Sequence, residues 1–130
     1  SDLTIKLNNG NVPAHKFILS ARSDYWNAAA LADVFELDWS DLDGDIGLIL
    51  LKWIYTSIVD KENLTLEFMK AASSFQLKEL VEQCETYLIG TVSLKDCVAL
   101  YTAAEGLGAE KLREHCGALM STHWVKSILQ

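Results

Sequence analysis

The sequence has 130 residues, of which 50% are hydrophobic, and a formal net charge of −7 at pH 7. This length and apolar content predict one compact domain with a sizeable core. The eleven Lys and Arg residues are spread singly, and the acidic balance counts against a surface for nucleic acid or anionic lipid.

Three cysteines, Cys84, Cys97 and Cys116, lie far apart in the chain. An odd number of distant cysteines favours buried thiols in a reducing, cytoplasmic setting over a secreted disulfide scaffold. The longest apolar run, residues 46–51, is far short of the ~20 residues of a membrane span, so we expect no direct membrane contact. A chain without a signal peptide that opens inside a strand pattern without Met is interpreted as an excised fragment.

The N-terminal residues predict a β-hairpin. Leu3, Ile5 and Leu7 alternate with polar residues, the period of a half-buried strand. Asn9-Gly10 suits a two-residue turn, and a short return strand should end near Pro13.

A helix is expected from about His15, followed by a short turn that Ser23 caps. On this helix Phe17, Ile18 and Ala21 should share one face. Residues 35–39 alternate again and predict a third strand with a polar outer side.

A strongly apolar helix is predicted from about Ile46 to Tyr55, with Asp43 or Asp45 as its cap. Because it is apolar on nearly every side, it should be the most enclosed helix of the fold. Ile58-Val59 can form one more short strand, and residues 60–63 a solvated turn.

The remaining chain reads as helices with their own boundary signals. One helix face is marked by Phe68 to Phe75, and the next runs from Leu77 to Leu88, where Gly90 can end it in the left-handed region. Ser93 and Asp96 resemble a capping box, and Val92 and Cys97 its hydrophobic staple. Helices over 94–105 and 109–121 should follow, joined by a turn at Gly106 and Gly108.

These helices contain a weak internal repeat. Residues 68–84 laid on residues 100–116 give five identities in seventeen positions. Any two amphipathic hairpins rich in Ala and Leu would share several matches, whereas true repeat units would stack on one another. The sequence leaves both interpretations open.

Several separated motifs agree in order with one family. "SDLTIKL", "HKFILSARSDYW", "IYT" and "AASSFQLKELVEQC" resemble the BTB/POZ domain over residues 2 to about 90, and residues 93–122 resemble the start of a BACK-like helical region. "ARSDYW", "WIYT", "FQL" and "THW" resemble more specifically the BTB domain of rabankyrin-type proteins, which carry ankyrin repeats and a FYVE zinc finger on endosomes.

The resemblance implies an α+β fold with a small, mostly antiparallel sheet covered by helices and followed by a helical hairpin. It implies a BTB/POZ core over residues 1–91 and a BACK-like extension over residues 92–130, packed on the core.

The same resemblance implies roles for polar residues. Asp2, His15, Lys16, Arg22 and Ser23 match signature positions that mostly orient loops and helix ends, in keeping with the unpaired backbone groups there. Alternatively, Asp2, Lys16 and Arg22 line a charged pocket offered to partners. The candidate partner-binding residues are Asp2, Lys16, Arg22, Tyr55, Ser57, Lys61 and Trp124, the last expected to be partly exposed.

No residue pattern predicts catalysis or a cofactor. Ser23, His15 and Asp24 fail as a triad, because an acid next to the serine cannot orient the far nitrogen of the histidine. The chain holds no Gly-x-Ser-x-Gly elbow, phosphate-cradling Gly-rich loop or His-Glu-x-x-His motif. We therefore predict that the protein is not an enzyme.

Metal binding is also not predicted. The acidic run 33–45 lacks the final Glu of an EF-hand, and its alternating apolar residues read as a strand. His115, Cys116 and His123, with Cys84 nearby, offer zinc-ligand types but no Cys-x-x-Cys pair. The three cysteines are interpreted as small hydrophobes on apolar faces.

The leading hypothesis, drawn from the resemblance, is a non-catalytic interaction module of an endosomal trafficking protein that self-associates or docks partners. The second is a substrate adaptor for cullin-3 ubiquitin ligases, with residues 57–63 and 93–122 as platform. Against it, residues 27–38 form a short span with no convincing hydrophobic-x-Glu motif. The third is a helical repeat scaffold, which the alternating strands disfavour, or an enzyme, which the missing nucleophile–base set disfavours. The oligomeric state of the fragment stays open, because many BTB dimers exchange an upstream segment.

Overall fold

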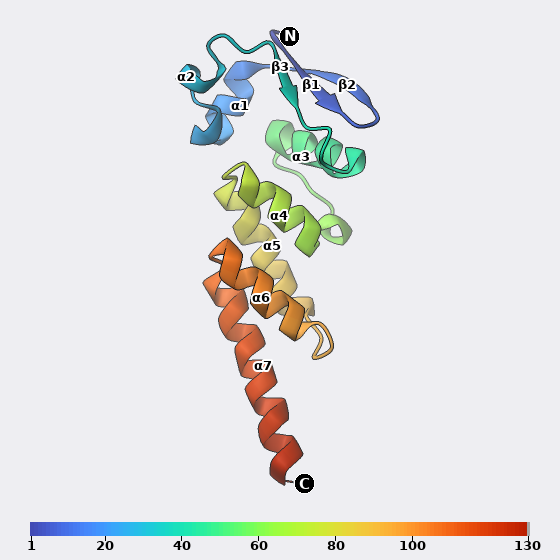
Figure 1. Ribbon diagram of the computed structural model, residues 1–130, viewed down its shortest axis with the longest axis vertical. Coiled ribbons are helices and arrows are strands. Elements are labelled where there is room, and N and C mark those ends of the chain that lie inside the picture. The colour runs from blue at the N-terminus through green and yellow to red at the C-terminus, as the bar shows by residue number, and fades with distance from the viewer. Residues whose placement is uncertain (130) are drawn as a thin grey trace. The chain divides into compact units, whose positions relative to one another are not determined.

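The computed structural model describes residues 1–129 (Figure 1). Their contacts divide them into two compact units: residues 1–63 with 74–77, and residues 64–73 with 78–129. The first unit holds the sheet and helices α1 to α3, and the second holds helices α4 to α7.

A three-stranded sheet forms one layer of the first unit, with the order β2-β1-β3. β1 (Leu3–Leu7) pairs antiparallel with β2 (Gly10–Ala14) and parallel with β3 (Glu36–Asp38). Leu3, Ile5 and Leu7 are buried, as the alternation predicts. The three predicted strands are confirmed, and the antiparallel part of the sheet is the hairpin.

Short helices follow the hairpin. α1 (Lys16–Arg22) leads into a single 3-10 turn, Asp24–Trp26, and then α2 (Ala28–Leu31). The predicted Ser23 cap is confirmed, because its Oγ accepts a hydrogen bond of 3.1 Å from the N–H of Tyr25.

α3 (Gly44–Thr56) begins at the predicted cap, where the Asp43 carboxylate accepts from the N–H of Asp45 at 2.9 Å. The prediction of a helix enclosed on nearly every side is wrong, because Leu48 and Tyr55 are 42% and 41% exposed. These two residues are seven positions apart and therefore share one helix face.

The predicted strand at Ile58-Val59 is also wrong. α3 ends at Ser57, which adopts the left-handed region with φ 62°, and the Ile58 N–H then donates to Thr56 Oγ1 at 3.1 Å. This local turn directs the chain to a second 3-10 turn, Lys61–Asn63, and leaves Ile58 exposed.

Aromatic rings form the core of the first unit. The Trp39 ring stacks on Phe75 at 4.7 Å and on Trp26 at 5.9 Å between centroids. Phe75 was predicted on a helix face, but it follows the end of α4 (Leu66–Ser74), in the turn where Gln76 is left-handed. That turn releases Phe75 from the helix and lets it join the two tryptophans.

The second unit is helical, with α5 (Lys78–Thr91), α6 (Cys97–Leu107) and α7 (Glu110–Leu129) after α4. Gly90 lies inside α5 and does not end it, and Gly106 lies inside α6, so the α6–α7 turn rests on Gly108, with φ 68°.

The predicted capping box does not start α6. The Ser93 hydroxyl donates to the Asp96 carboxylate at 3.0 Å, so neither side chain caps the backbone as the box requires. The helix therefore begins at Cys97, three residues later than expected.

The two hairpins share their geometry, which supports the repeat interpretation. Gln76 and Gly108, 32 positions apart, are both left-handed and occupy equivalent turns. The identical pairs Ala72/Ala104, Leu80/Leu112 and Cys84/Cys116 are all buried. The shared residues are thus largely those that face inward.

A buried carboxylate connects two helices of the second unit. Glu85 of α5 is 8% exposed and accepts from the N–H of Leu112 in the first turn of α7 at 3.1 Å. This bond satisfies one of the unpaired N–H groups of the helix start and places a negative charge at its positive end.

Two glycine substitutions distinguish close packing from open helix surface. A Cβ on Gly47 would lie 2.5 Å from Leu7 Cδ2, whereas a Cβ on Gly90 would meet no atom within 4 Å. We expect Gly47→Ala to destabilise the fold by about 1–3 kcal/mol, because the buried Leu7 must move. Gly90→Ala should instead stabilise it by up to about 1 kcal/mol. Urea unfolding of both variants checks this, and equal effects would contradict the close approach of α3 to β1.

Candidate protein-interaction surface

Asp2 closes the start of α1. Its Oδ1 accepts from the backbone N–H of Lys16 at 3.0 Å, although no side chain caps the helix locally. This hydrogen bond lowers the pKa of Asp2, so the carboxylate is ionised at neutral pH and favours the positive end of the helix dipole.

Arg22 closes the end of α3. Its Nε donates to the Ile54 carbonyl at 2.7 Å, and one Nη donates to the Trp53 carbonyl at 3.3 Å and to Ser57 Oγ. The guanidinium also lies 4.6 Å from the centroid of the Trp53 ring. The planar fork of donors fits these acceptors, and its positive charge suits the negative end of the helix.

Tyr55 forms a second connection between α3 and α1, at the start of α1. Its hydroxyl lies 2.9 Å from Nδ1 of His15, and the two rings meet edge to face at 6.0 Å. Ser23 Oγ, meanwhile, donates to the Phe75 carbonyl at 2.8 Å. His15 and Ser23 therefore have separate partners, and the structure does not pair them as base and nucleophile.

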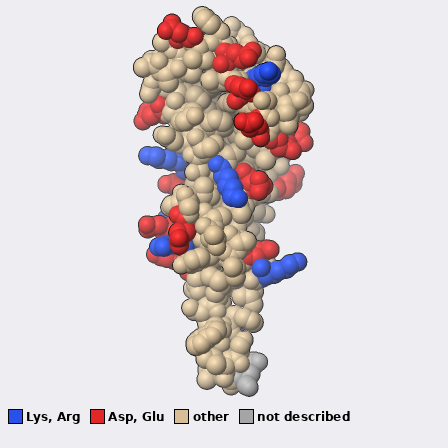
Figure 2. All heavy atoms as spheres, viewed as in Figure 1, with Lys and Arg blue, Asp and Glu red and all other residues tan. Residues whose placement is uncertain are grey.

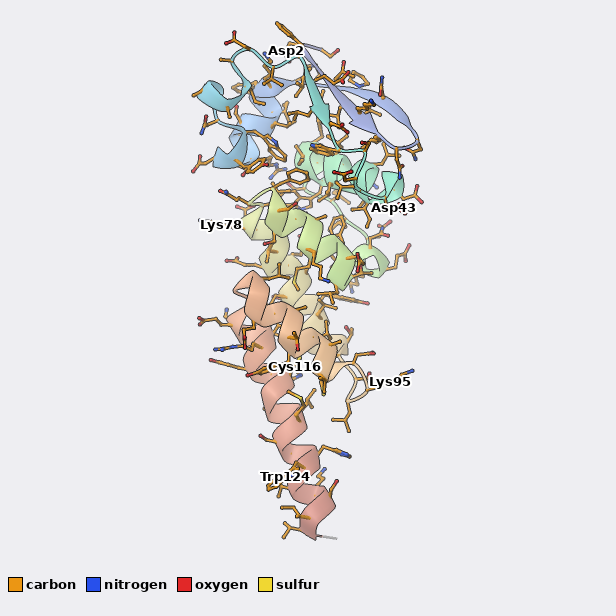
Figure 3. All side chains as sticks on the ribbon, in the orientation of Figure 1. Asp2, Asp43, Lys78, Lys95, Cys116 and Trp124 are labelled. Carbon is orange, nitrogen blue, oxygen red and sulfur yellow. The ribbon has the colours of Figure 1, made fainter. Side chains whose placement is uncertain are left out.

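The structure brings together only some of the candidate partner-binding residues. Asp2 meets the backbone of Lys16 at the start of α1, whereas Arg22, the last residue of α1, meets Ser57. Lys61 is exposed on its 3-10 turn, and Trp124, 66% exposed on α7, belongs to the second unit (Figure 3). The exposure predicted for Trp124 is confirmed.

An open pocket of about 250 Å³ lies between α1 and α2. We call its lining the α1–α2 surface; it comprises Lys16, Phe17, Ser20, Trp26, Ala28, Leu31 and Ala32. The helix face predicted to hold Phe17 and Ala21 is exposed: the Phe17 ring is 79% exposed and Ala21 is exposed as well, while Leu19 is fully buried. The face of α1 that packs inward follows Leu19, and Phe17 points away from it.

Sequence patterns gave little indication of this surface. Residues 28–30 are exposed alanines, and their single methyl groups are too small to cover the ring of Phe17. Together with Phe17 these alanines make the exposed apolar area contiguous, and contiguous apolar areas are the kind that mark contact surfaces.

The cysteines are all buried, which confirms their interpretation as small hydrophobes. Burial raises the pKa of Cys84 to about 12, and burial together with neighbouring Cys97 raises the pKa of Cys116. Within residues 1–129, no group of three or more His, Cys, Asp or Glu side chains is placed to hold a metal ion. None of the helices described there is long and apolar enough to cross a membrane.

Comparisons with known proteins agree on one family. The sequence model of the BTB/POZ domain matches residues 1–92. The chain is similar to Rabankyrin-5 from Homo sapiens and from Mus musculus, each 39% identical over 127 residues, or 95% of the chain. It spans 11% of the length of those proteins.

More distant relatives carry the same domain type. Kelch-like protein 40 from Xenopus laevis is 27% identical over 106 residues, which are 77% of the chain and 17% of that protein. The solved BTB domain of zebrafish PATZ1 superposes with a TM-score of 0.59 at 25% identity, covering 69% of this chain and 76% of that one.

The fork of Arg22 can be tested against the other arginine of the chain. Arg22→Lys keeps the charge but offers a single nitrogen to three acceptors, so we expect a loss of about 1–2 kcal/mol of unfolding free energy. Arg113→Lys is the matched control, with an expected change within about 0.5 kcal/mol. Chemical denaturation measures both, and equal losses would contradict the capping role of Arg22.

Proposed function

The chain belongs to the BTB/POZ family, and from this membership we propose that it is the self-associating interaction module of a larger rabankyrin-type protein. Family and relatives indicate a non-catalytic protein-interaction module. The association with endosomes and a second copy as partner are our proposals, as is the division into a core, residues 1–91, and a BACK-like extension, residues 92–130. The match of the family model to residues 1–92 supports that boundary.

The α1–α2 surface carries the proposal of self-association. It offers an exposed ring, Phe17, directly beside an open pocket of about 250 Å³. In a two-fold dimer the same surface meets itself, so Phe17 of each copy is able to fill the pocket of the other. Removing that ring from water would contribute about 1.5–3 kcal/mol per copy.

Electrostatics favour this surface over others on an acidic chain. Lys16 is the charged residue of the α1–α2 surface, and no carboxylate belongs to its lining. Burying such a surface leaves no ionised acid without water or a partner.

A second candidate is an adaptor for cullin-3, favoured by the last turn of α3 and the segment that follows it. Tyr55, Ile58 and Lys61 are all exposed there, and two of them are large apolar side chains. Against it stands the position of the single glutamate of residues 27–38. Glu36 belongs to β3, so the triplet Val34-Phe35-Glu36 enters the sheet and is not presented on a long segment before it.

Self-association is tested by placing a charge in the apolar surface. We expect Phe17→Glu to weaken the dimer at least about tenfold, because a carboxylate cannot enter the partner's pocket without losing hydration. Val98→Glu changes another exposed apolar residue, 61% exposed on α6, and should leave the dimer intact. Sedimentation equilibrium measures both variants. A folded wild-type chain that stays monomeric, or equal weakening by both changes, would refute self-association through this surface.

The cullin-3 alternative has its own measurement. We expect isothermal titration of the chain with the N-terminal domain of cullin-3 to give no heat. Sub-micromolar binding that Ile58→Asp abolishes and Phe17→Glu leaves unchanged would replace self-association with the adaptor function.

A further inference from the structure

One edge of the sheet has backbone groups without a strand beside it. The Thr4 N–H donates to the Phe35 carbonyl at 3.0 Å, and the Trp39 N–H donates to the Lys6 carbonyl at 2.8 Å. Phe35 and Trp39 therefore turn their backbone groups toward β1, and the alternation of a strand turns those of Glu36 and Asp38 the other way. Within the described residues no backbone hydrogen bond reaches them.

The opposite edge of the sheet is closed to another strand. In β2 the residues paired with Ile5 and Leu7 are Val12 and Gly10, so Asn11 and Pro13 turn their backbone outward. Proline has no N–H to donate, and an outward-pointing proline prevents the addition of a further strand. Strand addition is thus directed to β3.

The side chains of β3 define what such a strand must carry on the outer face of the sheet. Glu36 lies beside Thr4 and Asp38 beside Lys6, and both acids are exposed. Asp38 accepts from the Ser40 hydroxyl at 2.5 Å and from the Ser40 N–H at 2.9 Å, and these bonds lower its pKa. The Asp38 carboxylate is therefore ionised at neutral pH.

These charges determine which kind of strand can pair with the free edge of β3. The six acids between residues 33 and 45 have no base among them, and Figure 2 shows acidic side chains gathered on the visible face of this part of the molecule. A second β3 strand would place like charges opposite one another, which is unfavourable in a sheet. A strand with Lys or Arg at those positions would form favourable cross-strand pairs.

On the inner face of the sheet, a strand added to β3 must carry apolar side chains. Phe35 is 74% exposed, although it stands at the start of a strand whose next inward residues are half-buried Leu37 and buried Trp39. A strand added to β3 would lay its inward side chains along Phe35 and Leu37 and cover that ring.

We propose that the free edge of β3 binds an extended segment of a partner protein in which basic residues alternate with apolar ones, by adding it as a fourth strand. The basic side chains pair with Glu36 and Asp38 on the outer face, and the apolar ones cover Phe35 and Leu37. Backbone hydrogen bonds to Glu36 and Asp38 hold the segment, as in other cases of strand addition. The proposal does not rest on self-association, although the two surfaces adjoin: Nζ of Lys16, from the α1–α2 surface, lies 5.0 Å from the centroid of the Phe35 ring.

The test uses the 130-residue chain and a short synthetic peptide in which lysine and valine alternate. We expect saturable binding, with the amides of Glu36 and Asp38 protected from hydrogen exchange in the complex, as followed by NMR. A peptide of the same composition with its lysines and valines in separate blocks should bind about tenfold more weakly, because it cannot match both faces.

Two charge variants separate strand addition from general attraction. Glu36→Lys should weaken the alternating lysine peptide about tenfold. Asp33→Lys makes the same change within the acidic run but outside β3, and should have little effect. Absence of binding, binding without protection of the two amides, or equal loss in both variants would overturn the proposal.

Discussion

The first unit depends on side chains that hydrogen-bond the backbone groups at helix ends from positions far away in the sequence. α1 has seven residues, too few for a helix to persist alone in water. Asp2 supplies the acceptor at its start, and Arg22, its last residue, supplies the donors at the end of α3. The same two contacts thus fix the helix ends and hold α1 between the hairpin and α3. In the second unit Glu85 does the same for α7, with a buried carboxylate.

Sequence distance explains which of these contacts could be predicted. Ser23 and Asp43 cap turns two residues ahead of them, so their roles follow from residue type and position alone. Arg22 and Ile54 are 32 residues apart and meet only because α1 lies against α3. Tertiary placement also decided the exposure of Phe17, since a helix of two turns has apolar residues on more than one side.

The hairpin repeat shows a second limit of sequence patterns. Gly108 allows the left-handed turn to be predicted from the sequence, because glycine adopts positive φ without steric cost. Gln76 adopts the same conformation at the equivalent position without any such signal. The packing of Phe75 against Trp26 and Trp39 accompanies that strained turn, and the contact of these three rings supplies the kind of burial that can offset its cost. Sequence therefore predicted the helices of the first hairpin better than the turn between them.

The distribution of charge explains how a chain with a large negative net charge could still associate with a second copy. Two copies with a net charge of −7 repel each other, but at physiological ionic strength a charge is screened beyond about 8 Å. The acids that matter are therefore those beside the contact. The lining of the α1–α2 surface contains none, and Asp2, next to it, already accepts a hydrogen bond from the Lys16 N–H. The acids near β3 disfavour pairing of that edge with its own copy and, as we propose, favour a basic strand there. A single acidic chain can in this way keep an apolar surface for a second copy and a charged edge for a different partner.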